Sequence, residues 1–247
     1  MPDRPTILVP IRVLEGESIP EGVSTLLANA HVVLLGYHVL PEQTATGQAR
    51  MQFEDDGIRR LEEFETILED AGATVESRLV FTHESQKTID RMIAEYDCLA
   101  VLVPKAIGTL DNVLVAVRGT VALDRIARVI SGLFAATDVT VTLYHVATED
   151  ETDEDAHLLL EGISGRLFDG GMDTDAIESR VVRAQSPQEA ITDASSEFDV
   201  VVMGESDPSL VTFVFQMRAE QLADQFLGPV LVVQREPQTE VDESDPD

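Results

Sequence analysis

Two arginines occupy matching places in this sequence, each directly after a short apolar run. Arg12 follows Leu8-Val9-Pro10-Ile11, and Arg118 follows Leu114-Val115-Ala116-Val117. If these runs are strands of parallel sheets, both guanidinium groups lie at carboxyl ends of strands, where open α/β sheets bind their ligands. A guanidinium there can hold a carboxylate or a phosphate through two parallel hydrogen bonds. The alternative is that each arginine pairs with one of the many acidic residues nearby.

Two histidines also occupy matching places, and a histidine can act as a general base. Tyr37-His38-Val39 recurs as Tyr144-His145-Val146, but the sequence pairs no serine or cysteine nucleophile with either histidine. The acidic stretch 149–154 lacks the Asp/Asn/Gly order of a calcium loop, so we expect a solvated loop there. The remaining histidines show no metal-ligand spacing: His31, His83 and His157. We therefore expect no catalytic centre, no metal site and no bound cofactor.

These candidate residues belong to a long internal duplication. Residues 7–103 are repeated, in altered form, over residues 113–203. Besides the arginine and histidine runs, Glu76-Ser77-Arg78-Leu79-Val80 recurs as Glu178-Ser179-Arg180-Val181-Val182. Solenoid units recur every 20–50 residues or so, which is a much shorter period. The repeat is therefore typical of a duplicated domain.

Acidic residues dominate the charge of the chain. The sequence has 46 Asp and Glu against 17 Lys and Arg, a formal net charge of −29, and its only lysines are Lys87 and Lys105. Acids spread along the whole chain favour the solvated surface of a protein that works in molar salt. Nucleic-acid binding is not expected, because no basic patch is available to neutralise phosphates.

The hydropathy pattern indicates a cytoplasmic protein that is not embedded in a membrane. No apolar run reaches the roughly 18 residues that a spanning helix needs. The chain passes from Met1-Pro2-Asp3-Arg4 directly into an apolar run, without the pattern of a signal peptide. Cys98 lies alone in an apolar run, so we expect a buried thiol and no internal disulfide.

Strands and helices alternate along both copies. Short β-branched runs predict buried strands, and apolar residues at three- and four-residue spacing predict helices; one such set is Ile58, Leu61, Phe64 and Leu68. In the first copy we expect strands over 6–13, 31–40, 75–81 and 98–103, with helices over 19–29, 48–71 and 84–95. In the second copy we expect strands over 113–117, 139–146, 177–182 and 200–203, with helices over 121–135, 154–168 and 187–196.

Only the second copy continues further, with a helix over 208–226 and a fifth strand over 229–233. The alternation predicts tandem doubly wound parallel α/β sheets. We expect a truncated copy over residues 1–110, a full copy over 111–235, and a disordered acidic tail over 236–247. The first copy ends on an edge strand that needs a partner. The surplus strand can supply it through Val230, Leu231, Val232 and Val233, either within the chain as a pseudo-dimer or between chains as a homodimer.

The order of these pieces resembles the universal stress protein family. The resemblance rests on Ile7-Leu8-Val9-Pro10-Ile11, the His-Val strand ends, Val200-Val201-Val202-Met203-Gly204 and Pro229-Val230-Leu231-Val232-Val233. It covers nearly the whole chain and implies strand order 3-2-1-4-5 in the full copy. It also implies dimerisation through the last strand and, in one branch, ATP bound at the carboxyl ends of the strands.

The chain departs from that ATP-binding branch at several positions. The branch has an aspartate after its first strand, where this chain has Arg12 and Arg118. The branch also has a glycine-rich loop and a Gly-Ser pair, because backbone N–H groups must approach phosphates closely. Here Gly204 is followed by Glu205-Ser206-Asp207-Pro208, and Gln216-Met217 stands at the Gly-Ser position. Family-type ATP binding is therefore not expected.

The leading hypothesis is a non-catalytic, universal-stress-type regulatory or interaction protein that does not bind ATP. The alternative is a nucleotide- or anion-binding stress sensor that uses a strand-end crevice formed by Arg12, Val39, Arg118, Val146, Gly204 and Ser206. An ATPase is a third reading, for which the sequence supplies neither base nor metal ligand. The apolar run 210–215 either packs inside the chain or faces a partner, such as another subunit or a membrane transporter.

Overall fold

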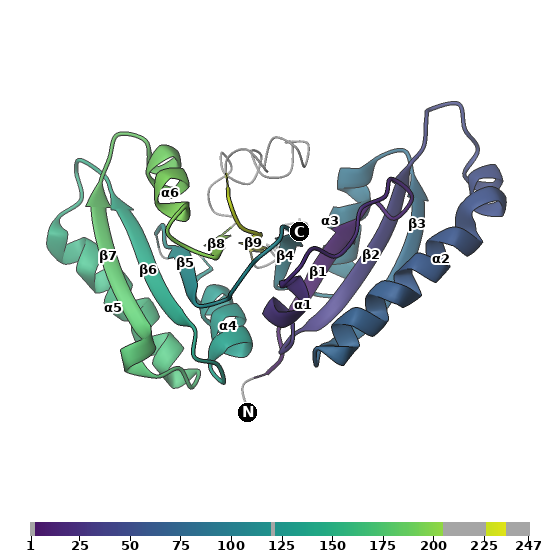
Figure 1. Cartoon of the computed structure of the whole chain (residues 1–247). Coiled ribbons are helices and arrows are strands. Elements are labelled where there is room, and N and C mark those ends of the chain that lie inside the picture. The colour runs from purple at the N-terminus through teal and green to yellow at the C-terminus, as the bar shows by residue number, and fades with distance from the viewer. Residues whose placement is uncertain (1–2, 120–121, 205–225, 236–247) are drawn as a thin grey trace, which may run out of the picture.

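The computed structural model describes residues 3–119, 122–204 and 226–235. The first copy comprises β1 (Thr6–Ile11), α1 (Val23–Leu26), β2 (His31–Val39), α2 (Thr46–Asp70), β3 (Thr74–Thr82), α3 (Ser85–Glu95) and β4 (Ala100–Val103). The second comprises β5 (Asn112–Ala116), α4 (Leu123–Phe134), β6 (Thr140–Ala147), α5 (Asp153–Asp169), the 3-10 turn η1 (Thr174–Ala176), β7 (Ile177–Arg183), α6 (Pro187–Ser195), β8 (Val200–Gly204) and β9 (Val230–Val233). The two copies stand side by side in Figure 1.

All described strands join one nine-stranded sheet in the order β3-β2-β1-β4-β9-β8-β5-β6-β7. Pairing is parallel within each copy, from β3 to β4 and from β7 to β9. Ile7, Leu8 and Val9 are all buried although they alternate between the two faces of the sheet. The predicted doubly wound α/β fold, with strand order 3-2-1-4-5 in the second copy, is confirmed.

The strand β9 joins the two copies within one chain. It runs parallel to β8 and antiparallel to β4, with Val232 opposite Val101. All four residues of β9 are buried. The edge of the truncated copy is therefore covered by the surplus strand of the full copy, which selects the intrachain pairing from the two alternatives left by the sequence.

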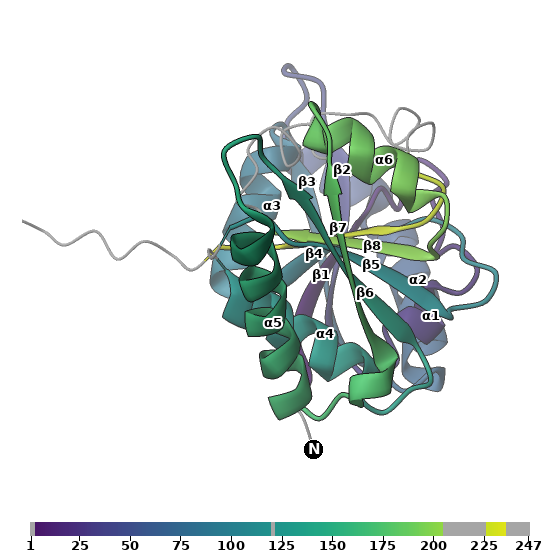
Figure 2. The same cartoon turned by 90° about the vertical axis from the view of Figure 1, so that its left-hand side faces the viewer.

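Helices cover both faces of the sheet, and the two faces differ. On one face, side chains from α1, α2, α4 and α5 form a single apolar cluster that continues across both copies. On the other face, α3 and α6 each cover a separate cluster. Figure 2 shows α4 and α5 on the opposite side of the sheet from α6.

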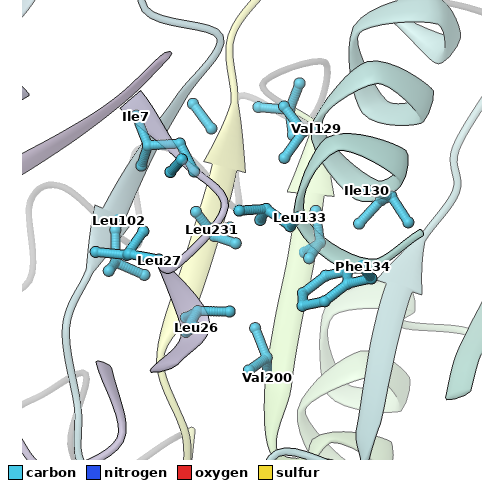
Figure 3. Packing of buried hydrophobic residues seen from close by; sticks show 14 of the residues in the cluster. Ile7, Leu26, Leu27, Leu102, Val129, Ile130, Leu133, Phe134, Val200 and Leu231 are labelled. Atoms are coloured by element: carbon cyan, nitrogen blue, oxygen red, sulfur yellow. The ribbon is translucent and has the colours of Figure 1, made fainter. Parts of the chain in front are cut away.

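On the face with the continuous cluster, apolar side chains of the α1 region and of α4 pack together between the copies. Figure 3 shows Leu26 of the first copy and Leu133 and Phe134 of the second in one cluster around Leu231 of β9, with Leu27 beside Leu102 on the side of the first copy. The side-chain amide of Asn29 donates to the Leu133 carbonyl at 3.0 Å. The packing thus binds the copies through side chains as well as through strand pairing.

The predicted helix over 19–29 is wrong in extent, because only Val23–Leu26 is helical. Gly22 precedes it in a left-handed conformation, with φ of 80°. A Cβ at Gly22 would lie 2.5 Å from the Ile107 carbonyl oxygen, and the Ile107 N–H donates to the Glu21 carbonyl at 2.8 Å. Contact with the connector between the copies therefore shortens this helix.

The predicted inward face of α2 is wrong at Ile58, which is 43% exposed. Gly57 takes the inward place, since a Cβ there would meet the Leu79 side chain at 2.8 Å. Gly57, Leu61, Phe64 and Leu68 all lie buried at three- and four-residue spacing. The expected face is therefore correct at Leu61, Phe64 and Leu68 and wrong only at its first position.

Two expectations lie outside the described residues: the helix over 208–226, apart from Phe226, and the tail over 236–247. In the described ranges, no helix is long and apolar enough to cross a membrane. Nor do three His, Cys, Asp or Glu side chains gather there as metal ligands.

Candidate functional site

The candidate site is a crevice at the carboxyl ends of β5, β6 and β8 in the second copy. The three strands are in register there, since Ala116 at the end of β5 lies opposite both Tyr144 and Met203. Residues that follow or end these strands line the crevice: Val117, Arg118, Val146 and Gly204. Pro187 and Ile191 of α6 form a further wall. The structure therefore brings together three residues predicted from the sequence, Arg118, Val146 and Gly204.

The floor of the crevice is apolar and closely packed. Met203, Tyr144 and Ile191 are all buried. The Tyr144 hydroxyl donates to the Ala190 carbonyl at 3.3 Å, which fastens α6 against the floor, and burial raises the pKa of Tyr144. The cavity volume is about 20 Å³, which is room for about one water molecule. Ser206, the remaining predicted residue of this crevice, lies outside the described residues.

His145 contacts the backbone of Val117, one of the residues that line this crevice. Its ring is 3% exposed, with Nδ1 2.8 Å from the Val117 carbonyl and Nε2 2.9 Å from the Glu151 carboxylate. Both ring nitrogens are engaged inside the protein, so the geometry gives His145 a structural role. Glu151 lies in the stretch that we expected to be a solvated loop, and for this residue the expectation is wrong. A carboxylate six residues after a strand-end histidine was the available signal.

Arg183 of the neighbouring strand β7 holds the segment from Thr148 to Asp153, which includes Glu151. Its guanidinium donates to the carbonyls of Thr148 and Glu151 at 2.9 and 2.8 Å, and to the Asp153 carboxylate at 2.6 Å. The hydrogen bond from Arg183 lowers the pKa of Asp153. Sequence reasoning missed Arg183, because its partners are mostly backbone carbonyls.

The corresponding place in the first copy is filled by the chain itself. The backbone N–H of Arg12 donates to the Glu17 carboxylate at 2.7 Å. The Arg12 guanidinium donates from Nε to the Tyr37 hydroxyl at 3.2 Å and from Nη1 to Glu15 at 3.3 Å. The hydrogen bond with Tyr37 raises the pKa of Arg12, and burial raises the pKa of Tyr37. Val39 stands at the end of β2, 37% exposed.

His38 lies in different surroundings from its counterpart His145. Its Nδ1 is buried with no hydrogen-bond partner in the described structure. The ring lies 6.0 Å from the Phe53 ring and 6.3 Å from the Phe81 ring, measured between centroids. The two histidines therefore share a place in the repeat without sharing contacts, so the repeat places no common base at the strand ends.

Comparisons with known proteins give the fold. No protein-family model matches the chain, and no curated protein matches it. A universal stress protein from Archaeoglobus fulgidus DSM 4304 superposes with a TM-score of 0.63 at 16% identity, over 93% of this chain and 96% of that one. A putative universal stress protein from Pseudomonas aeruginosa UCBPP-PA14 gives a TM-score of 0.51 at 14% identity, over 93% of each chain. The chain has the fold of universal stress proteins over nearly its whole length.

Proposed function

We propose that this chain is a non-catalytic regulatory or interaction protein of the universal stress type. We further propose that it acts in the cytoplasm and does not bind ATP in the manner of the ATP-binding branch. The fold supports the assignment to the universal stress type, since both structures named above share it. The contacts of Arg12 support the absence of ATP binding.

The first strand-end position is occupied by the protein's own groups. Glu17 accepts the Arg12 backbone N–H, and Glu15 and Tyr37 accept hydrogen bonds from its guanidinium. A triphosphate placed there would have to displace two carboxylates, both of which would repel it. These contacts support a structural role for the first copy, without nucleotide binding at this position.

The second strand-end position offers little room. The crevice has an apolar floor and a cavity volume of about 20 Å³. Beyond Gly204 the sequence supplies Glu205 and Asp207 in place of the glycines that would approach phosphates. Tight packing and added negative charge both weigh against ATP here.

One observation favours the alternative, a nucleotide- or anion-binding stress sensor. Arg118 and the backbone of Gly204 line the same crevice, which lies where open α/β sheets bind ligands. A guanidinium at such a strand end suits a carboxylate or a single phosphate. ATPase activity has weaker support, because His145 is buried with both ring nitrogens engaged.

Thermal unfolding in molar KCl, with and without Mg·ATP, separates these functions. The proposal predicts an unchanged melting temperature, because a ligand stabilises only a protein that binds it. A clear rise that is abolished by Gly204→Asp would overturn the proposal in favour of the sensor. Gly165→Asp on the exposed face of α5 is the control, since it adds the same charge far from the crevice. Arg118→Ala then shows whether that arginine contributes to any binding observed.

A further inference from the structure

A second groove lies between α4, the end of α5 and the N-terminal segment. It has a volume of about 600 Å³ and is open to solvent. Asp124, Arg128 and Ser131 line it from α4, Arg166 and Asp169 line it from α5, and Asp3 closes a further side. Because α5 ends there before β7 begins, the groove lies toward the amino ends of the strands, away from the crevice at Arg118.

Close backbone contacts fix the walls of this groove. A Cβ at Gly132 would lie 2.8 Å from the Asp3 carbonyl oxygen, and one at Gly170 would lie 2.2 Å from the Ser131 hydroxyl oxygen. Arg166 joins the two helices, with its Nε 2.6 Å from the Asp124 carboxylate. The N-terminal segment and the end of α5 are therefore both held against α4, so the groove is preformed.

Polar groups without partners gather on this groove. The Ser131 hydroxyl is buried and has no hydrogen-bond partner in the described structure. The side chains of Arg128, Asp169 and Asp3 form no hydrogen bond or ion pair in the described ranges. Among the described arginines, only Arg128 and Arg91 have a side chain without a hydrogen-bond or ion-pair partner. Unpaired charges of both signs are notable here, because nearly all other arginines of the described ranges have partners.

We propose that this groove binds a small zwitterion of the α-amino acid type. Arg128 would hold the carboxylate through its planar guanidinium, and Asp169 would accept a hydrogen bond from the ammonium group. Asp124 and Arg166 neutralise each other. The remaining opposite charges line one groove without pairing directly, so a molecule with both charges can bridge them.

Ligands with one charge fit this groove less well. An anion would meet the carboxylates of Asp3 and Asp169, and a cation would meet the guanidinium of Arg128. No metal-ligand cluster forms in the part of the chain that the structure describes. This site is independent of the proposed function, because it shares no residue with the strand-end crevice.

A titration followed by nuclear magnetic resonance tests the proposal, with the amide signals of Gly170 and Gly171 as reporters. The probes are L-alanine, propionate and ethylammonium, of which the last two carry one charge each. The lowest KCl concentration that keeps the chain folded is used, because salt screens exposed charges. We expect saturable shifts with L-alanine and affinities at least about tenfold weaker with either single-charge probe. Absence of saturation with L-alanine, or equal binding of propionate, would overturn the zwitterion site.

Variants then assign the contacts. Arg128→Gln and Asp169→Asn should each weaken L-alanine binding by about tenfold, because each removes a charge-assisted hydrogen bond. Arg91→Gln is the matched control, since it removes another exposed arginine without a partner, and it should leave the affinity unchanged. All three side chains are exposed, so folding should be preserved. If Arg91→Gln weakens binding as much as Arg128→Gln, the shifts come from general charge effects and the proposal fails.

Discussion

At the scale of single residues, the contacts around Arg12 carry more information than its position in the sequence. Its guanidinium and backbone N–H bind Tyr37, Glu15 and Glu17 of the same copy. This is the acid pairing that the sequence offered as the structural alternative to anion binding. Arg118 holds the equivalent position and lines the small crevice of the second copy, so the two copies differ in their surroundings although the residue is the same.

Cys98 gives a pH-dependent prediction at this scale. Burial raises the pKa of Cys98 to about 12, so the folded thiol stays protonated where the unfolded thiol ionises. The unfolded state therefore binds fewer protons, and stability falls as the pH rises above the unfolded pKa of about 8.5, by up to about 1.4 kcal/mol per pH unit. Cys98→Ala should remove this part of the slope. Denaturant unfolding of both proteins between pH 8 and 11 measures it, and parallel curves would contradict the assignment.

At the scale of elements, Arg125 of α4 fixes the end of β9. Its side chain is 9% exposed and donates to the carbonyls of Gln234 and Arg235 at 3.4 and 2.7 Å. It also pairs with the Asp97 carboxylate at 3.0 Å. Asp97 belongs to the first copy, so one side chain joins α4, the end of β9 and the start of β4.

Arg125→Met is therefore expected to destabilise the chain by about 1–3 kcal/mol, since at similar side-chain volume it removes the donors to the Gln234 and Arg235 carbonyls, of which Gln234 belongs to a buried residue. The control is Arg128→Met on the same helix, where the exposed side chain has no partner in the described structure; it should change stability by less than about 0.5 kcal/mol. Urea unfolding in molar KCl compares the two. Equal effects would show that Arg125 does not fasten β9.

The sequence predicted most elements because their apolar periods reflect burial on a sheet. It failed at Val23–Leu26 and at Ile58, where contacts between distant segments decide the outcome. Ile107 shortens the first helix, and Gly57 packs against Leu79 in place of Ile58. In the crevice, the arginine and glycine positions were predictable from the repeat. The partners Glu151 and Glu17 were not, because loop conformation determines which acid reaches its target.

At the scale of the whole molecule, β9 turns two unequal copies into one sheet. The apolar cluster on one face continues through both copies, and Val101 pairs with Val232 across the junction. The division at residues 110 and 111 stays a prediction about the repeat. The shared core predicts that this division does not separate folding units.

We therefore expect a single unfolding transition in differential scanning calorimetry, with equal calorimetric and van't Hoff enthalpies. The net charge of −29 predicts that the melting temperature rises with KCl, as salt screens repulsion between carboxylates. Two resolved transitions would show that the copies unfold separately. A melting temperature independent of KCl would argue against the proposed adaptation to molar salt.

The central claim is that the chain has this fold without family-type ATP binding. Equilibrium dialysis of the whole chain against labelled Mg·ATP in molar KCl tests it directly, because the method counts bound ligand per chain. We predict no saturable binding at millimolar ATP, since Glu15 and Glu17 fill the first position and the second crevice holds about one water molecule. Saturable binding that approaches one ATP per chain and is lost in Gly204→Asp would contradict the account.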